Sequence, residues 1–159
     1  MNDDLQMSDE FILPLFNEIY VVKERDFSIE YHPLGQGKQK LLLLVSSHSE
    51  EFLENNEIQL LNTIIEKGLR RTIEDVWIVN INRFPDPTLN HIWDYFQPSQ
   101  VIIWGCADWV KKQDISFSLH QPAYINGSEV LFANALSSYL TDTAAKGKLW
   151  SAMQRMFFN

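Results

Sequence analysis

The sequence predicts an α/β fold built on a central, mainly parallel β-sheet. Three short apolar runs, each bounded by polar residues, have the pattern of strands that are buried on both faces of a sheet. The segments between these runs carry apolar residues at helical spacing. This alternation of strand and helix is typical of a parallel sheet with helices on its faces. The chain has 159 residues, which is enough for one domain with a full core.

The strands are predicted directly from the apolar runs. We expect them at Lys40–Ser46, Asp75–Ile81 and Gln100–Trp104. Tyr124 and Ile125 lie in a fourth extended piece, which the turn sequence "NGSE" separates from the apolar run "VLFAN". No internal repeat, low-complexity tract or domain linker interrupts this order, so we expect one α/β domain.

Two helices are predicted between the strands. The first begins at a cap on Ser47 or Ser49 and ends near Gly68, with glutamates in its first turn, where the helix dipole favours them. The second spans Pro87–Phe96, because proline is favoured at the start of a helix and Pro98 follows its end. Each helix therefore presents an apolar stripe to the sheet. The stripes consist of Phe52, Leu53, Leu60, Leu61, Ile64, Ile65, Leu89, Ile92, Trp93 and Phe96.

The chain closes with a predicted helix in "TDTAAKGKLWSAMQRMFFN". Thr141, Asp142 or Thr143 can cap it. Gly147 inside the helix costs about 1 kcal/mol relative to alanine, which tertiary packing must offset. An apolar stripe on the helix is expected to cover the sheet, while for Phe158 two roles stay open, packing in the core or contact with a partner. The stripe consists of Leu149, Trp150, Met153, Met156 and Phe157, of which we expect the first two to be core residues.

The N-terminal part of the chain does not follow the strand and helix pattern. Residues 1–10 are polar and acidic, and Phe11–Val22 is apolar but interrupted by Pro14. This stretch forms either a short helix followed by an extended piece or a docking peptide. We therefore expect an N-terminal segment, residues 1–26, followed by a single α/β domain, residues 27–159.

Composition narrows the class of protein. The formal net charge of −8 repels phosphate backbones and argues against a large nonspecific DNA-binding face. A single cysteine excludes a disulfide framework and a zinc site made of several thiolates. The acidic start of the chain does not resemble a signal peptide, and the longest apolar run, Leu41–Val45, is too short to span a bilayer. We expect a cytoplasmic protein.

The ends of parallel strands are where an active site of such a sheet usually lies. After the first predicted strand, "SSHSEE" lacks the glycines of a phosphate cradle, and His48 is expected to be a solvated loop histidine. After the second strand, Asn80, Asn82 and Asp86 are expected to form turns rather than bind a ligand. After the third, Cys106 is expected to be buried as a small apolar group.

Known signatures of chemistry are missing from the sequence. It contains no metal-ligand spacing, no G-x-S-x-G and no H-E-x-x-H. Trp109 precedes two adjacent lysines, Lys111 and Lys112, while the other tryptophans lie on predicted apolar faces, so stacking on nucleic-acid bases is not favoured. We therefore expect a binding module with no catalytic residues, no metal and no cofactor.

The segment "GSEVLFANALSSYLTDTAAKGKLWSAMQRMF" resembles the C-terminal part of the psi subunit of bacterial DNA polymerase III and its relatives. That family carries a short hydrophobic strand, a Leu-rich turn, and then a spaced basic residue followed by Leu-Trp inside a last helix. Upstream, "KLLLLVSS", "EDVWIVNI" and "QVIIWG" fall where the family has its central strands. The resemblance covers residues 41–157 in order, and its ending is the specific part. The matching residues there are Val130, Leu131, Leu136, Leu140, Lys146, Leu149 and Trp150.

This resemblance implies a three-layer α/β fold similar to that of uracil-DNA glycosylases, but without their enzymatic role. It implies a non-enzymatic clamp-loader accessory subunit. In that family an N-terminal segment docks on the collar of the clamp loader, and a second surface holds the chi subunit. The partners to expect are therefore clamp-loader ATPase subunits and a chi-like subunit. By position, the docking residues are Phe11, Ile12, Leu13 and Phe16, and the structural motif is Lys146, Leu149 and Trp150.

Two alternatives stay open. A base-excising enzyme on the same fold would need a carboxylate or asparagine after the first strand to activate water, and a histidine late in the chain. Glu50, Glu51 and His120 fit those positions. The other alternative is an orphan α/β domain whose protein partner is unrelated to replication.

Overall fold

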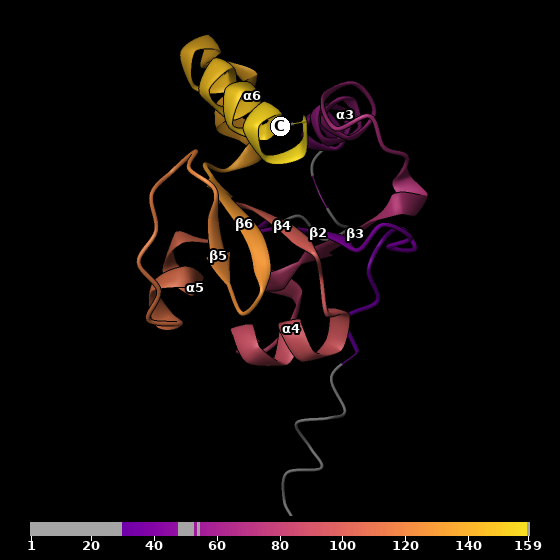
Figure 1. The fold of residues 1–159 in the computed structure, drawn as a ribbon, viewed down its shortest axis with the longest axis vertical. Helices are drawn as coiled ribbons and strands as arrows, with labels where there is room; N and C mark the ends of the chain where they lie inside the picture. The colour runs from indigo at the N-terminus through magenta and orange to yellow at the C-terminus, as the bar shows by residue number, and fades with distance from the viewer. Residues whose placement is uncertain (1–29, 48–52, 54, 159) are drawn as a thin grey trace, which may run out of the picture. The chain divides into compact units, whose positions relative to one another are not determined.

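A computed structural model describes residues 30–47, 53 and 55–158 of the chain (Figure 1). The chain divides into two units, Met1–Tyr31 and His32–Asn159, and the elements described below belong to the second. The predicted N-terminal segment, residues 1–26, lies outside the described residues, so its separation from the domain stays a prediction.

A mostly parallel, five-stranded sheet is the centre of the second unit, as far as the structure describes it. The strands lie side by side in the order β3-β2-β4-β6-β5, and only β5 runs antiparallel to its neighbour. In the register of the central strands, Leu43 lies beside both Ile78 and Ile102. The prediction of an α/β fold with a mainly parallel sheet is thereby confirmed. The strands are β2 (Leu41–Val45), β3 (Val76–Asn80), β4 (Gln100–Trp104), β5 (Ala123–Ile125) and β6 (Ser128–Ala133).

The turn between β5 and β6 has the conformation that its sequence requires. Asn126 and Gly127 both have positive φ, 50° and 86°. Two-residue hairpin turns of type I′ need positive φ at both central positions, and Asn-Gly is a strongly preferred pair there. The predicted turn at "NGSE" is therefore a tight hairpin, and it makes β5 the antiparallel edge of the sheet.

Helices cover both faces of the sheet (Figure 1). On one face α3 and α6 lie together, and on the other lie α4 and α5. The first predicted helix is described from Asn55, so its predicted caps are not tested, and it ends at Gly68 as expected. Asp142, one of three predicted caps of the last helix, accepts a hydrogen bond from the Ala145 N–H at 3.0 Å. The helices are α3 (Asn55–Thr63), continued by the π-helical η2 (Ile64–Gly68), α4 (Leu89–Phe96), α5 (Ala107–Lys112) and α6 (Thr143–Phe158); short 3₁₀ turns are η3 (Ile73–Asp75), η4 (Ile81–Arg83) and η5 (Leu136–Leu140).

Alternate residues of each strand pack against the two helical layers. Leu41, Leu43 and Val45 of β2 belong to a core cluster with residues of α3, η2, η5 and α6. On the other face, Trp77 of β3 packs its ring against Phe96 of α4 at 5.0 Å between centroids. Strands that are buried on both faces explain why the apolar runs of the sequence are continuous rather than alternating.

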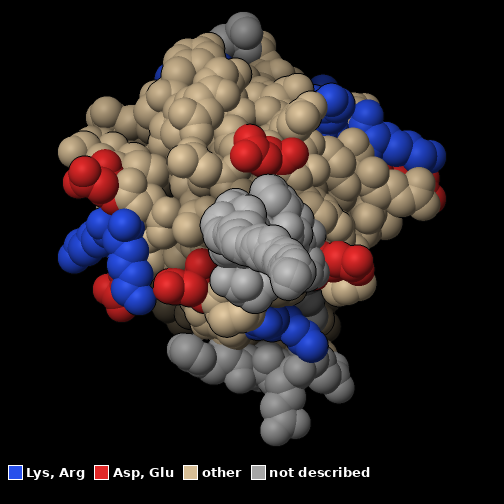
Figure 2. All heavy atoms as spheres, turned by 90° about the horizontal axis from the view of Figure 1, so that it is seen from below, with Lys and Arg blue, Asp and Glu red and all other residues tan. Residues whose placement is uncertain are grey.

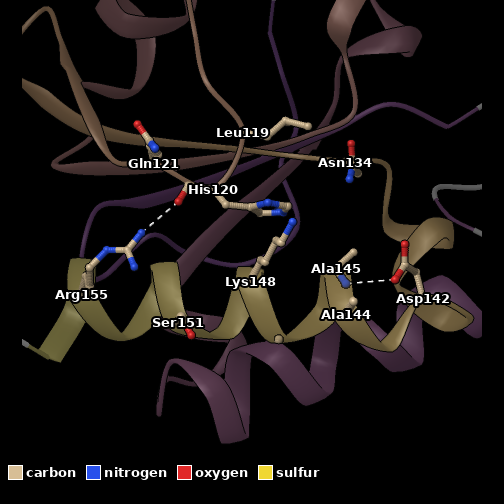
Figure 3. A pocket seen from close by; sticks show the side chains of 11 residues that line it. Leu119, His120, Gln121, Asn134, Asp142, Ala144, Ala145, Lys148, Ser151 and Arg155 are labelled. Carbon is tan, nitrogen blue, oxygen red and sulfur yellow. Dashed lines mark hydrogen bonds between the residues drawn. The ribbon is translucent and has the colours of Figure 1, made fainter.

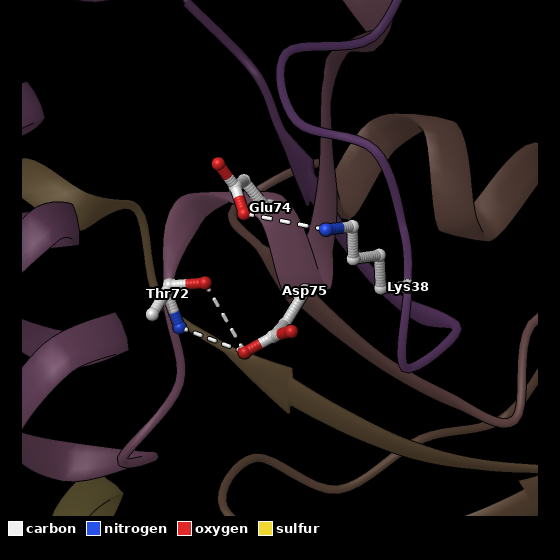
Figure 4. Close-up of polar contacts among 4 residues, drawn as sticks. All are labelled: Lys38, Thr72, Glu74 and Asp75. Atoms are coloured by element: carbon white, nitrogen blue, oxygen red, sulfur yellow. Dashed lines mark hydrogen bonds and ion pairs between the residues drawn. The ribbon is translucent and has the colours of Figure 1, made fainter.

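The edge of the sheet at β3 is covered by the segment of the chain that precedes β2. Gly37 donates its N–H to the Val76 carbonyl at 2.9 Å, and a Cβ at Gly37 would overlap the Trp77 indole. Figure 4 shows how the turn before β3 is held: the Asp75 carboxylate accepts from the Thr72 N–H at 2.9 Å, and Lys38 pairs with Glu74 at 3.4 Å. The entry of β3 into the sheet is thus fixed by local polar contacts.

No helix in the described part of the chain is long and apolar enough to cross a membrane.

Candidate functional site

Asn80, the last residue of β3, holds the loop that leaves β2. Its side chain is 1% exposed. The amide oxygen accepts hydrogen bonds from the N–H groups of Ser47 and Asn82, each at 3.1 Å, and the amide nitrogen donates to the Ser47 carbonyl at 3.0 Å. The bond to Asn82 closes the turn η4, which confirms the predicted turn role of Asn80. Its side-chain oxygen and nitrogen are both bonded to backbone groups.

Cys106 follows β4 and is 8% exposed, which confirms the predicted burial. Burial raises the pKa of its thiol to about 12. The thiol donates to the Trp104 carbonyl at 3.3 Å. The thiolate is the nucleophilic form of cysteine, so the protonated thiol of Cys106 is a weak nucleophile at neutral pH.

A small hollow of about 240 Å³ lies between η4 and α5. Its polar wall includes the predicted turn residues Asn82 and Asp86, joined by Asp108 and Lys112. The indole N–H of Trp109 donates to the Pro87 carbonyl at 2.6 Å, so this tryptophan ties α5 to the start of α4. The hollow therefore brings together residues from two strand ends, but its aromatic residue is used in packing.

A larger hollow, which we call the α6 groove, lies between α6 and the segment that leads into β5 (Figure 3). Its volume is about 890 Å³. One wall is formed by Leu119, His120, Gln121 and Asn134. The other wall is α6, which is lined on this side by Ala144, Ala145, Gly147, Lys148, Ser151 and Arg155. Small residues thus alternate with two cations along the helix.

His120 is fixed in the wall of the α6 groove by Tyr139. The Tyr139 hydroxyl accepts a hydrogen bond from the Asn134 N–H at 2.8 Å and lies 2.7 Å from His120 Nε2. Partial burial and the nearby Lys148 ammonium lower the pKa of His120 below its usual value. The imidazole is therefore neutral at neutral pH, and the hydroxyl can donate its own proton to Nε2.

The two ends of the α6 groove carry opposite charges. Arg155 donates from Nη2 to the His120 carbonyl at 3.0 Å, and Lys148 points toward His120 from the preceding part of the helix (Figure 3). Seven residues of α-helix separate these cations by roughly 10 Å. Asp142 stands at the opposite end, where its carboxylate caps the first turn of α6.

Another side of α6 carries exposed aromatic side chains. Trp150 is 44% and Phe158 is 40% exposed. The Arg70 guanidinium lies over the Phe158 ring at 5.5 Å, and that of Arg71 lies over the Phe157 ring at 5.9 Å. These five residues form what we call the α6 aromatic surface.

The expectation that Trp150 is a core residue is wrong. Leu149 is 2% exposed and belongs to the core cluster, as predicted, but the next residue is rotated by about 100° around the helix. The Trp150 ring therefore faces outward and packs against Gly68, where an added Cβ would lie 3.0 Å from it. Lys146, one turn earlier, is also exposed.

Several predicted site residues lie outside the described residues. They are the docking residues Phe11, Ile12, Leu13 and Phe16, and the loop residues His48, Glu50 and Glu51. The pairing of a glutamate with His120 is therefore untested. Sequence reasoning missed Lys148 and Arg155, although their seven-residue spacing, with Ser151 between them, places them on one side of a helix.

The described residues carry no metal cluster, and the face of the molecule in Figure 2 shows no continuous basic field. No group of three or more His, Cys, Asp or Glu among them is arranged to hold a metal ion. Acidic and basic side chains are interspersed on the face of the molecule in Figure 2. The α6 groove and the α6 aromatic surface are thus the two candidate sites, and both depend on the same helix.

Comparison of the chain with protein-family models gives no match. Comparison with curated proteins gives no match either.

Proposed function

We propose that this chain is a non-enzymatic adaptor resembling the psi subunit of the DNA polymerase III clamp loader. The observation that carries the proposal is the α6 aromatic surface. It lies on the helix that bears the resemblance, and it exposes Trp150 and Phe158 beside two arginines. Tryptophan and arginine are enriched among the residues that dominate protein interfaces, because they supply large contact areas and directed hydrogen bonds.

The ends of the strands support an adaptor over an enzyme. Asn80 is engaged with backbone groups, and the Cys106 thiol is buried with a raised pKa. Both residues stabilise the fold at positions where an enzyme of this class would place reactive groups. Helices on both faces of a mostly parallel sheet also fit the three-layer fold, similar to uracil-DNA glycosylases, that the resemblance implies.

The adaptor would use two contacts. By the resemblance, the segment with Phe11, Ile12, Leu13 and Phe16 docks on the collar formed by the clamp-loader ATPase subunits. The α6 aromatic surface, with Trp150 at its centre, is then available for a second protein, for which a chi-like subunit is the candidate. A protein with both contacts links the clamp loader to another factor without chemistry of its own.

The proposal is tested by pull-down of purified clamp-loader ATPase subunits from the same organism with the full-length chain. We expect retention of the subunits by the wild type and loss of retention by a Phe11→Ala, Phe16→Ala double variant. Tyr124→Ala is the matched control, because Tyr124 is exposed on the edge strand β5 and belongs to neither contact. The proposal fails if the wild type does not retain the subunits.

A base-excising enzyme is the second candidate, and the position of His120 in the α6 groove is the observation that favours it. Incubation with uracil-containing single-stranded DNA distinguishes the two candidates. The adaptor proposal predicts no release of uracil. Release by the wild type that disappears in His120→Gln would replace it with the enzyme.

A further inference from the structure

We propose that the α6 groove binds an extended acidic peptide of a partner protein. In this arrangement, carboxylates of the peptide pair with Lys148 and Arg155, and its backbone amides bond with Gln121 and Asn134. The site is independent of the clamp-loader proposal, because it lies on a different side of α6 from the aromatic surface. It therefore predicts a class of ligand whichever protein supplies it.

Among the described residues, no carboxylate forms an ion pair with the two cations of the groove, Lys148 and Arg155. The Lys148 charge also reaches across the groove, since it contributes to the lowered pKa of His120. Although the net charge of the chain is −8, two cations with no carboxylate partner among the described residues line one hollow, where a carboxylate of a ligand would complement them.

Arg155 is held in position to receive a carboxylate. Its bond to the His120 carbonyl uses one of the five N–H donors of the guanidinium. The remaining N–H groups can donate to both oxygens of a carboxylate in a fork, which is the strong geometry for such pairs. The bond to the loop reduces the conformational entropy that the side chain would lose on binding.

The floor of the groove has room for a peptide chain. Ala144, Gly147 and Ser151 line it with small side chains, and a Cβ built on Gly147 meets nothing within 4 Å. Alternate side chains of an extended peptide are about 7 Å apart. Acidic residues two to four positions apart could therefore reach both cations, whose separation along the helix is roughly 10 Å.

The observations favour a peptide over single-stranded nucleic acid. Binding of nucleic acid needs exposed aromatic rings on which bases stack. Trp150 and Phe158, which could supply them, lie outside the groove. Gln121 and Asn134 instead offer both a donor and an acceptor, which match a peptide backbone. Asp142 would repel a continuous phosphate backbone, and it orients a peptide with its acidic part toward Arg155.

The test is fluorescence anisotropy of a short fluorescein-labelled peptide of alternating aspartate and alanine, titrated with the full-length chain at physiological salt. Lys148→Glu and Arg155→Glu should each weaken binding about tenfold or more, because each removes a charge-assisted contact. Lys146→Glu is the matched control, since it makes the same charge change two residues away on a side of α6 that does not line the groove. It should keep the affinity within about twofold of the wild type.

Several outcomes would overturn the proposal. One is absence of binding by the wild type, and another is equal weakening by Lys146→Glu and Lys148→Glu, which would mean diffuse attraction. Tighter binding of an oligothymidine than of the acidic peptide would identify a nucleic-acid site instead. Because Arg155→Glu also removes the bond to His120, Arg155→Lys and circular dichroism control for misfolding. Clamp-loader retention is measured separately, so either proposal can fail alone.

Discussion

The polar residues at the end of β3 and those beside the end of β6 differ in what their side chains contact. Asn80 is buried and holds the backbone of the neighbouring loop. Lys148 and Arg155 lie on a helix beyond the end of β6 and face an open groove. A polar residue at a strand end is therefore not by itself evidence of a site. The two regions differ in which polar atoms a ligand can reach. The side-chain amide of Asn80 is bonded to backbone, whereas Lys148 and the remaining N–H groups of Arg155 line the groove.

The largest expected effect is a loss of stability when the side chain of Asn80 is removed. Asn80→Ala should lower the free energy of unfolding by about 2–4 kcal/mol, because it removes two buried hydrogen bonds between the Asn80 side chain and the Ser47 backbone. Urea denaturation measures the change. Asn82→Ala is the control, since this residue is exposed and contributes its backbone N–H to the turn. Equal losses in the two variants would contradict the role assigned to Asn80.

Tyr139 is buried in the core, and its hydroxyl bonds two residues of the α6 groove wall. Tyr139→Phe removes a hydroxyl that bonds both the Asn134 N–H and His120, so we expect a loss of about 1–2 kcal/mol in stability. The loop with His120 should also become less ordered, which amide hydrogen exchange of residues 119–121 would detect. Unchanged exchange there would mean that the hydroxyl does not fix the groove wall.

Two helical glycines, Gly147 and Gly68, should respond differently to substitution by alanine. Gly147→Ala should stabilise the protein by about 0.5–1 kcal/mol, because alanine is the better helix former and its Cβ meets open space. Gly68→Ala should not stabilise, since its Cβ would press on the Trp150 ring. Thermal unfolding of the pair checks both signs. Stabilisation by Gly68→Ala would show that Trp150 is not packed against η2.

The smallest expected effect is a dependence of stability on pH. The folded pKa of His120 lies below its ordinary value of 6.5, so the unfolded chain binds more protons as the pH falls. The contribution of His120 to stability is then complete above pH 6.5 and is lost on acidification below it. His120→Gln should remove this part of the pH dependence, and Lys148→Gln should reduce it by raising the pKa. NMR titration of the imidazole provides the measurement, and a pKa of His120 at or above 6.5 would contradict the prediction.

The strands could be predicted from the sequence almost to the residue, because continuous apolar runs such as Leu41–Val45 have few other places in a fold. The burial of Cys106 followed from its residue type. The orientation of Trp150 was predicted wrongly, because Leu149 and Trp150 are adjacent in sequence and only one of them is buried against the core. The α6 groove could not be predicted either, because it forms only when the loop at His120 meets Arg155, which is distant in sequence.

The central claim is that Asn80 stabilises the fold while Lys148 binds a ligand. It is tested most directly in two variants, Asn80→Ala and Lys148→Gln. For each variant, the affinity for the acidic peptide and the free energy of unfolding are measured. We expect Asn80→Ala to lose stability but to bind the peptide like the wild type at a temperature where it is folded. We expect Lys148→Gln to keep its stability within about 0.5 kcal/mol and to bind several-fold more weakly. Loss of peptide binding in folded Asn80→Ala, with full binding by Lys148→Gln, would contradict this claim.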